Sequence, residues 1–231
     1  MSKINNLCDN IPIQSQDQFE QLLKHFNITR TPELLDNIRS TYKDIIIPDN
    51  LIERINWAIN KPPEFVARSG EPIGKQRKIA AIKEKTWGNI MINQTDCTQW
   101  TTSLGENLVK DILTIKGENP RKPLTKNNLN PDWETDDYIY EVKTRSWNVG
   151  GTAGEKVLGT FIKYQDIPEL YGKPLKIVCV AYQEEELTNG KTAYFGENRT
   201  KKTQKILNIA KEWNIEYITF SDLVKSLLTN S

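Results

Sequence analysis

The chain has 231 residues, of which 37% are hydrophobic and 26% charged, so it can bury a sizeable core without disulfides or a structural metal. Its 31 basic and 30 acidic side chains leave a formal net charge of +1, and this overall balance indicates no polyanion partner. The single histidine, His25, excludes most chemistry based on clustered or paired imidazoles, and its apolar-rich surroundings favour a structural role.

Cysteine usage and the N-terminal sequence bear on the compartment. Cys8, Cys97 and Cys179 are scattered without a C-x-x-C spacing, which argues against a zinc site or a disulfide framework and is typical of a reducing compartment. The N-terminus lacks a basic segment followed by an apolar core, and no apolar run approaches the roughly 18 residues of a membrane span. We therefore expect a cytoplasmic protein with no membrane partner.

The first third of the chain has the pattern of helices. Capping residues and an apolar spacing near 3.6 predict helices over residues 19 to 26, 33 to 42 and 50 to 60. Pro62 and Pro63 then break the pattern, because consecutive prolines exclude helix continuation. We predict a helical N-terminal subdomain over residues 1 to 65 and a second unit over 66 to 231, with one continuous domain as the alternative.

The rest of the chain changes from helix to strand periodicity. A short basic helix is expected over 75 to 86, and an amphipathic helix begins at Ser103. The later elements are a hairpin over 129 to 144 with its turn at Asp136-Asp137, a buried strand over 174 to 182, a helix over 200 to 213 and a strand over 215 to 220. From Ser103 the order is helix-strand-strand-strand-helix-strand, which predicts an α/β fold with a mixed sheet flanked by helices.

Two carboxylates and a lysine fall together on the hairpin. Asp132 follows Pro131 on the first strand, and Glu141 and Lys143 share one face of the second. Pairing across the turn brings Asp132 close to Glu141, and two carboxylates with the intervening Val142 carbonyl are ligands that Mg²⁺ prefers. Lys143 is suited to activating a water or to stabilising developing charge. The alternative is a surface strand with an exposed ion pair.

Pro131-Asp132, Glu141-Val142-Lys143 and the order of elements resemble the PD-(D/E)xK nuclease superfamily, and most of all type II restriction endonucleases. The resemblance covers roughly half the chain and implies a restriction-endonuclease-like core. It also implies Mg²⁺ bound by Asp132 and Glu141, with Lys143 assisting the attacking water. Mn²⁺ is expected to substitute, and Ca²⁺ to support DNA binding without cleavage.

Three further acids compete for a place in this site. Many members of the superfamily carry a glutamate on the helix before the hairpin, and Glu106 occupies the corresponding place. Its alternative role is the capping partner of Ser103. Asp136 and Asp137 are rival metal ligands, although consecutive acids at a hairpin tip are usually turn residues.

The resemblance implies a site-specific endonuclease that cuts double-stranded DNA and leaves 5′-phosphate and 3′-hydroxyl ends. One active site per chain suggests a homodimer on a palindromic site, and such an enzyme coexists with a DNA methyltransferase as its genetic partner. The alternatives are a structure-selective repair or recombination nuclease and a non-catalytic DNA-binding protein with the same core.

Basic residues are concentrated locally despite the small net charge. Residues 61 to 88 hold 7 basic and 3 acidic side chains and residues 191 to 231 hold 7 and 4, whereas residues 164 to 190 hold 2 and 5. The Gly-rich loop after Lys143 is predicted to face DNA, the alternative being that its Trp147 packs on the core. Solvated helix faces explain the basic runs almost as well. The candidate DNA contacts are Arg68, Lys75, Arg77, Lys78, Arg145, Trp147, Asn148, Lys156, Arg199, Lys201 and Lys202.

Overall fold

The computed structural model describes residues 10–12, 46–48, 50–62, 65, 73–148, 157–190 and 193–229. The helices expected over 19 to 26 and 33 to 42 lie outside this part of the chain, as do Arg68 and Lys156. Two short strands, β1 (Asn10–Pro12) and β2 (Ile46–Pro48), pair antiparallel. Within the described ranges, no helix has both the length and the apolar character needed to cross a lipid bilayer.

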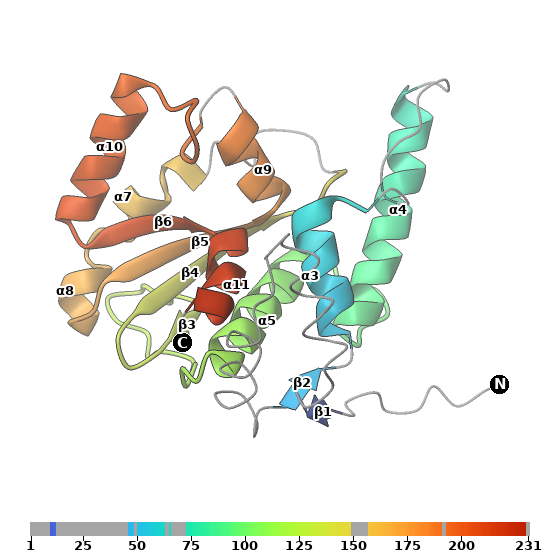
Figure 1. The fold of residues 1–231 in the computed structure, drawn as a ribbon, viewed down its shortest axis with the longest axis horizontal. Coiled ribbons are helices and arrows are strands. Elements are labelled where there is room, and N and C mark those ends of the chain that lie inside the picture. Colours follow the sequence, from blue (N-terminus) through green and yellow to red (C-terminus); the bar gives the residue numbers. More distant parts are fainter. Residues whose placement is uncertain are drawn as a thin grey trace.

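A four-stranded mixed sheet forms the centre of the molecule (Figure 1). Its strands in spatial order are β3 (Trp133–Glu134), β4 (Ile139–Arg145), β5 (Leu175–Ala181) and β6 (Ile215–Thr219). The hairpin pair β3 and β4 is antiparallel, whereas β5 runs parallel to β4 and β6 parallel to β5. The prediction of an α/β fold with a mixed sheet is confirmed.

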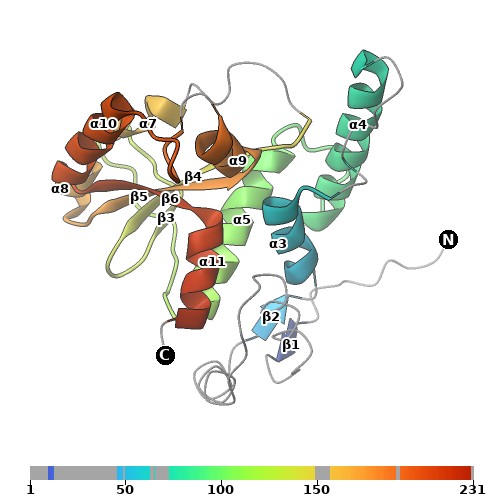
Figure 2. The same ribbon diagram turned by 45° about the horizontal axis from the view of Figure 1, so that its top comes forward.

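Helices cover both faces of this sheet (Figures 1 and 2). Tyr140 and Val142 of β4 pack into one core with α3 (Leu51–Asn60), α5 (Trp100–Ile115) and α11 (Phe220–Thr229). Ile139 points to the opposite face, as the period of two requires. The core on that face includes side chains from α7 (Thr160–Lys163), α8 (Ile167–Tyr171), α9 (Tyr182–Asn189) and α10 (Lys201–Glu212).

The segment before the two prolines belongs to the same core as the sheet. Leu51, Ile55 and Trp57 of α3 are fully buried in the cluster that also contains the inner face of α5. The prolines end α3 without dividing this core. Whether residues 1 to 65 form a separate subdomain stays a prediction, because most of them lie outside the described residues.

The observed helices differ from the expected ones at their ends and in number. The basic helix is α4 (Ile73–Met91), which is longer than expected. Because α5 begins at Trp100, Ser103 lies inside it, and the interpretation of Ser103 and Glu106 as a capping box is wrong. Three short helices, α7 to α9, were not expected. The helices α7 and α8 lie in the crossover that parallel pairing of β4 and β5 requires.

Candidate functional site

The β3 edge of the sheet brings Asp132 beside the middle of β4. The Asp132 amide donates to the Tyr140 carbonyl at 3.0 Å, which aligns the end of β3 with β4. The Asp132 Oδ2 atom accepts a hydrogen bond from the Val142 amide at 2.6 Å. Asp132 is thus placed next to Glu141, which is only 3% exposed, and the proximity expected from the hairpin is present.

The local electrostatics disfavour two ionised carboxylates in the absence of a cation. Burial raises the pKa of Asp132 to about 7, and the neighbouring Glu141 and then Glu106 act in the same direction. The Val142 amide and the Lys143 ammonium oppose this shift without cancelling it. A half-buried acid of this kind, beside a second acid, is stabilised in its ionised form when a positive charge binds between them.

One oxygen of the carboxylate pair is left without a hydrogen bond. Glu141 Oε1 forms an ion pair with Lys143 Nζ, whereas the buried Glu141 Oε2 has no hydrogen-bond partner among the described residues. A buried unsatisfied oxygen is costly, so it marks a place for a ligand that supplies positive charge. This orphaned atom is the observation that fits a divalent cation.

The remaining donor is the main-chain carbonyl of Val142. In an extended strand the N–H and C=O groups of one residue point to the same side, and the Val142 amide faces Asp132. Two carboxylates and a carbonyl suit Mg²⁺, which keeps several waters. Across the described ranges, no three Asp, Glu, His or Cys side chains form a metal site by themselves, so water would complete the coordination.

Glu106 lies close enough to this pair to add to the pKa shift of Asp132. Its carboxylate accepts from Lys122 Nζ at 3.1 Å, and its carbonyl accepts from Trp133 Nε1 at 2.9 Å. Gly105 allows α5 to approach β4, because a Cβ there would lie 1.7 Å from Thr144 Oγ1. Close packing of α5 on β4 thus sets Glu106 beside the carboxylate pair.

The rival acids at the hairpin tip lie in the turn. Asp136 and Asp137 are exposed, and Asp136 pairs with Arg121 at 2.9 Å. Both belong to the turn that connects β3 and β4. The structure therefore brings Glu106, and neither of these two, to the carboxylate pair.

Two residues at the end of α7 were missed by sequence reasoning. Tyr164 is buried against the site, and its pKa is raised by burial and then by Glu141 and Asp132. The exposed Lys163 donates from Nζ to the Tyr164 hydroxyl at 3.1 Å, and Lys143 Nζ lies 5.9 Å from the Tyr164 ring centroid. No sequence signal marks them, because a four-residue helix shows no periodicity. A phenol thus adjoins Glu141, and the ammonium group of Lys163 is hydrogen-bonded to that phenol.

Lys122 adds a further cation on the exposed side. Its Nζ lies 4.2 Å from the Trp133 ring centroid while it pairs with Glu106, and its side chain is 56% exposed. The Trp133 ring holds the lysine by a cation–π contact. This lysine was not among the residues proposed from the sequence.

The loop side chains that were expected to face DNA are part of the interior. Arg145 pairs with Glu186 at 2.5 Å, Trp147 Nε1 donates to the Trp57 carbonyl at 2.8 Å, and Asn148 Nδ2 donates to the Phe65 carbonyl at 2.7 Å. All three are less than 10% exposed. Contrary to the expectation, Arg145 holds the end of β4 to α9, Trp147 bonds α3, and Asn148 bonds Phe65 between α3 and α4. The core-packing alternative for Trp147 is confirmed.

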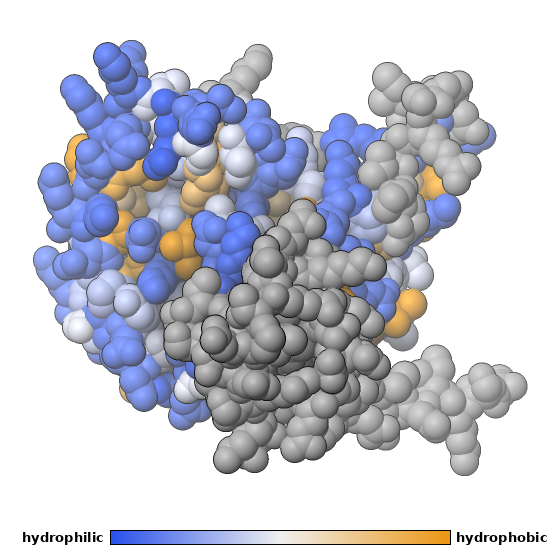
Figure 3. Space-filling model, in the orientation of Figure 1, coloured by the Kyte–Doolittle hydropathy of each residue, from blue (hydrophilic) through white to orange (hydrophobic). Residues whose placement is uncertain are grey.

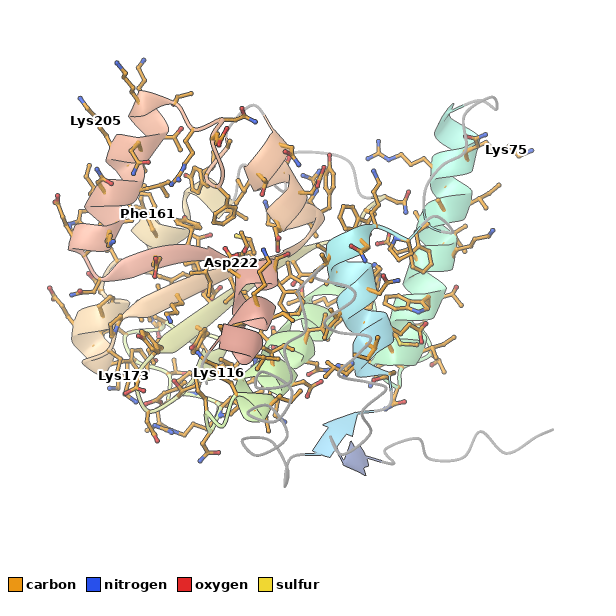
Figure 4. All side chains as sticks on the ribbon, in the orientation of Figure 1. Lys75, Lys116, Phe161, Lys173, Lys205 and Asp222 are labelled. Atoms are coloured by element: carbon orange, nitrogen blue, oxygen red, sulfur yellow. The ribbon has the colours of Figure 1, made fainter. Side chains whose placement is uncertain are left out.

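The basic groups on the helices lie on opposite sides of the molecule. Figure 4 shows Lys75 projecting from the end of α4 and Lys205 from α10, with the sheet between them. The exposed candidates in these two groups are Lys75, Arg77 and Lys78 on α4, with Arg199, Lys201 and Lys202 at the start of α10. Arg77 Nε also donates to the Asn148 carbonyl at 3.0 Å. Their contact with DNA stays a prediction.

We compared the chain with models of known protein families, with curated protein sequences and with solved structures, and none of the three comparisons finds a match.

Proposed function

We propose that this protein is a Mg²⁺-dependent endonuclease that hydrolyses phosphodiester bonds of double-stranded DNA. One observation carries the proposal: the half-buried Asp132 carboxylate lies beside the buried Glu141 carboxylate, of which one oxygen pairs with Lys143 and the other has no hydrogen-bond partner among the described residues. This arrangement agrees with the resemblance to PD-(D/E)xK nucleases on the same residues.

Each residue has a role that follows from its place. Asp132, Glu141 and the Val142 carbonyl would hold the cation. When bound, Mg²⁺ would neutralise the phosphate and stabilise the charge that develops on its oxygens. Lys143, whose side chain is 30% exposed, reaches from the buried pair toward solvent, where it would hold the attacking water by a hydrogen bond or stabilise the same charge.

The neighbouring cations supply positive charge where the overall balance has none. Lys163 is exposed and bonds Tyr164, and Lys122 is exposed and pairs with Glu106. Both lysines are suited to binding the phosphates that flank the scissile bond. Tyr164 restricts the space around Glu141. The near-zero net charge of the chain therefore does not describe the charge around this site.

More specifically, we propose a type II restriction endonuclease that leaves 5′-phosphate and 3′-hydroxyl ends. Such an enzyme would act as a homodimer on a palindromic site and have a DNA methyltransferase as its genetic partner. The carboxylate pair favours catalysis over a non-catalytic DNA-binding protein, because ionisation of Asp132 beside Glu141 opposes folding and DNA binding alone does not require it.

Incubation of the protein with a large mixed-sequence duplex DNA and Mg²⁺ tests the proposal. Discrete fragments with 5′-phosphate ends are expected for the restriction class. A preference for junctions, mismatches or nicks in a substrate panel would replace that class by a repair or recombination nuclease. Absence of cleavage on every DNA would contradict nuclease activity altogether.

A further inference from the structure

The helix α10 presents an exposed stripe of side chains that the fold of one chain does not use. Ile206, Ile209 and Trp213 are 41%, 42% and 42% exposed. Lys202 precedes Ile206 by one turn, and spacings of four and three residues place Lys202, Ile206 and Ile209 on one side of the helix. Trp213 follows four residues later as the C-cap of α10. We call Lys202, Ile206, Ile209 and Trp213 the α10 stripe.

The stripe is separate from the side of α10 that packs on the sheet. That side consists of Thr203, Leu207 and Ala210, of which Thr203 and Ala210 are buried. A further exposed apolar side chain, Ile162 at 57%, lies on α7, whose Phe161 ring contacts Trp213. Figure 3 shows apolar surface among hydrophilic side chains in this part of the molecule. Grouped exposed apolar side chains of this kind mark interaction surfaces more often than scattered ones do.

The two ends of the stripe carry opposite charges. Its N-terminal end is basic, with Lys201, Lys202 and Lys205. At its C-terminal end, Trp213 and Glu212 line a cavity of about 450 Å³ together with Asp166, Glu169 and Lys173, so acidic side chains outnumber basic ones in this cavity, while Lys211 of the last turn is basic. An antiparallel copy of the same helix would therefore meet opposite charge at both ends.

We propose that the α10 stripe is the surface on which two copies of this chain associate, with their α10 helices antiparallel about a two-fold axis. Ile206 then faces Ile209 of the second copy, and Lys202 faces its Trp213 and Glu212. The same patch serves both copies, as an isologous contact requires. Antiparallel helix dipoles add to the contact, because each basic or acidic end lies beside the opposite end of its neighbour.

The purpose of this pairing rests on the proposed nuclease function. A dimer would provide a second candidate site for the second DNA strand. The Trp213 ring contacts Phe161 of α7 at a centroid distance of 5.9 Å, and the chain at the end of α7 continues into Tyr164, which lies against Glu141. Each copy thus has its candidate site next to the helix through which the copies pair. Lys202, expected from the sequence to contact phosphate, is assigned to this contact instead.

Sedimentation of the purified full chain without DNA tests the surface. The apolar area of a single helix pair is small, so we expect a dimer with a dissociation constant on the order of micromolar. Ile206→Glu should weaken it by at least about tenfold. Ile82→Glu is the matched control, because Ile82 is 65% exposed on α4, and it should leave the dimer unchanged. A wild-type chain that stays monomeric, or an Ile206→Glu chain that still dimerises, overturns the proposal.

A charge exchange tests the antiparallel arrangement with surface changes that spare the core. Lys202→Glu and Glu212→Lys should each weaken self-association, because like charges then oppose each other at both ends. An equimolar mixture of the two variants should dimerise again, since every ionic contact in the mixed dimer joins opposite charges. A mixture that stays monomeric overturns the arrangement. Dimers that cut no DNA would contradict only the proposed nuclease function. DNA cleavage by a monomeric chain would contradict only the proposed α10 contact.

Discussion

Replacement of Asp132 by Asn should stabilise the protein at neutral and alkaline pH when no divalent cation is present. Burial and Glu141 raise the pKa of Asp132 from 3.8 to about 7, so ionisation of this side chain opposes folding. Asparagine keeps an oxygen that can accept the 2.6 Å hydrogen bond from the Val142 amide, while the charge is removed. The substitution therefore isolates the electrostatic contribution.

The magnitude follows from proton linkage. Below pH 3.8 the carboxyl is protonated in both folded and unfolded chains, and it contributes no pH dependence. Between pH 3.8 and about 7 the folded chain binds more protons, so the free energy of unfolding decreases as the pH rises. The pKa of Asp132 differs by roughly 3 units between the folded and unfolded chains, and each unit corresponds to about 1.36 kcal/mol. Above pH 7 the free energy of unfolding is therefore lower by about 4 kcal/mol than at pH below 3.8.

Urea denaturation in EDTA from pH 4 to pH 8 measures this difference. Wild type and Asp132→Asn should have similar stabilities near pH 4 and diverge to about 4 kcal/mol at pH 8, the variant being the more stable. Asp136→Asn is the control, because Asp136 lies at the exposed hairpin tip, and its curve should follow that of wild type. Parallel curves for wild type and Asp132→Asn would refute the electrostatic account of the site.

Two further substitutions test the scaffold around the site by urea denaturation. Gly105→Ala should destabilise the protein by about 2 to 4 kcal/mol although alanine favours helices, because its Cβ would lie 1.7 Å from Thr144 Oγ1; Thr144→Ala should recover part of the loss, and a stabilising Gly105→Ala would contradict the close packing. Glu84→Ala should lower the free energy of unfolding by about 3 kcal/mol or more, because the buried Glu84 carboxylate accepts hydrogen bonds from Trp57, Trp147 and Asn148. Thr86→Ala, at an exposed position, is the control, and an equal loss for both variants would contradict this role.

The sheet and the carboxylate pair could be predicted because their signals are local. The alternation through Tyr140 and Val142 and the apolar run of β5 fix two strands within short segments. Asp132 and Glu141 are nine positions apart in the hairpin, so their proximity follows from the pairing of β3 with β4. The same reasoning correctly left Asp136 and Asp137 in the turn.

The misplaced residues depend on partners far away in the sequence. Trp147 donates to Trp57 across 90 residues and Asn148 to Phe65 across 83, so composition alone suggested an exposed loop where the chain is buried. Tyr164 reaches the site only because the crossover between two parallel strands returns it over Glu141. Such contacts are set by tertiary packing, which one sequence does not display.

Cleavage by a Lys143→Ala variant tests the central claim most directly. Wild type and variant are incubated with linear duplex DNA and Mg²⁺, and DNA binding is measured in Ca²⁺. Lys225→Ala serves as the matched control, because Lys225 is exposed on α11, which covers the opposite face of the sheet. We expect cleavage by wild type and by Lys225→Ala, and a loss of at least about 100-fold for Lys143→Ala with binding retained. Cleavage by Lys143→Ala at the wild-type rate, or no cleavage by wild type, would contradict the account.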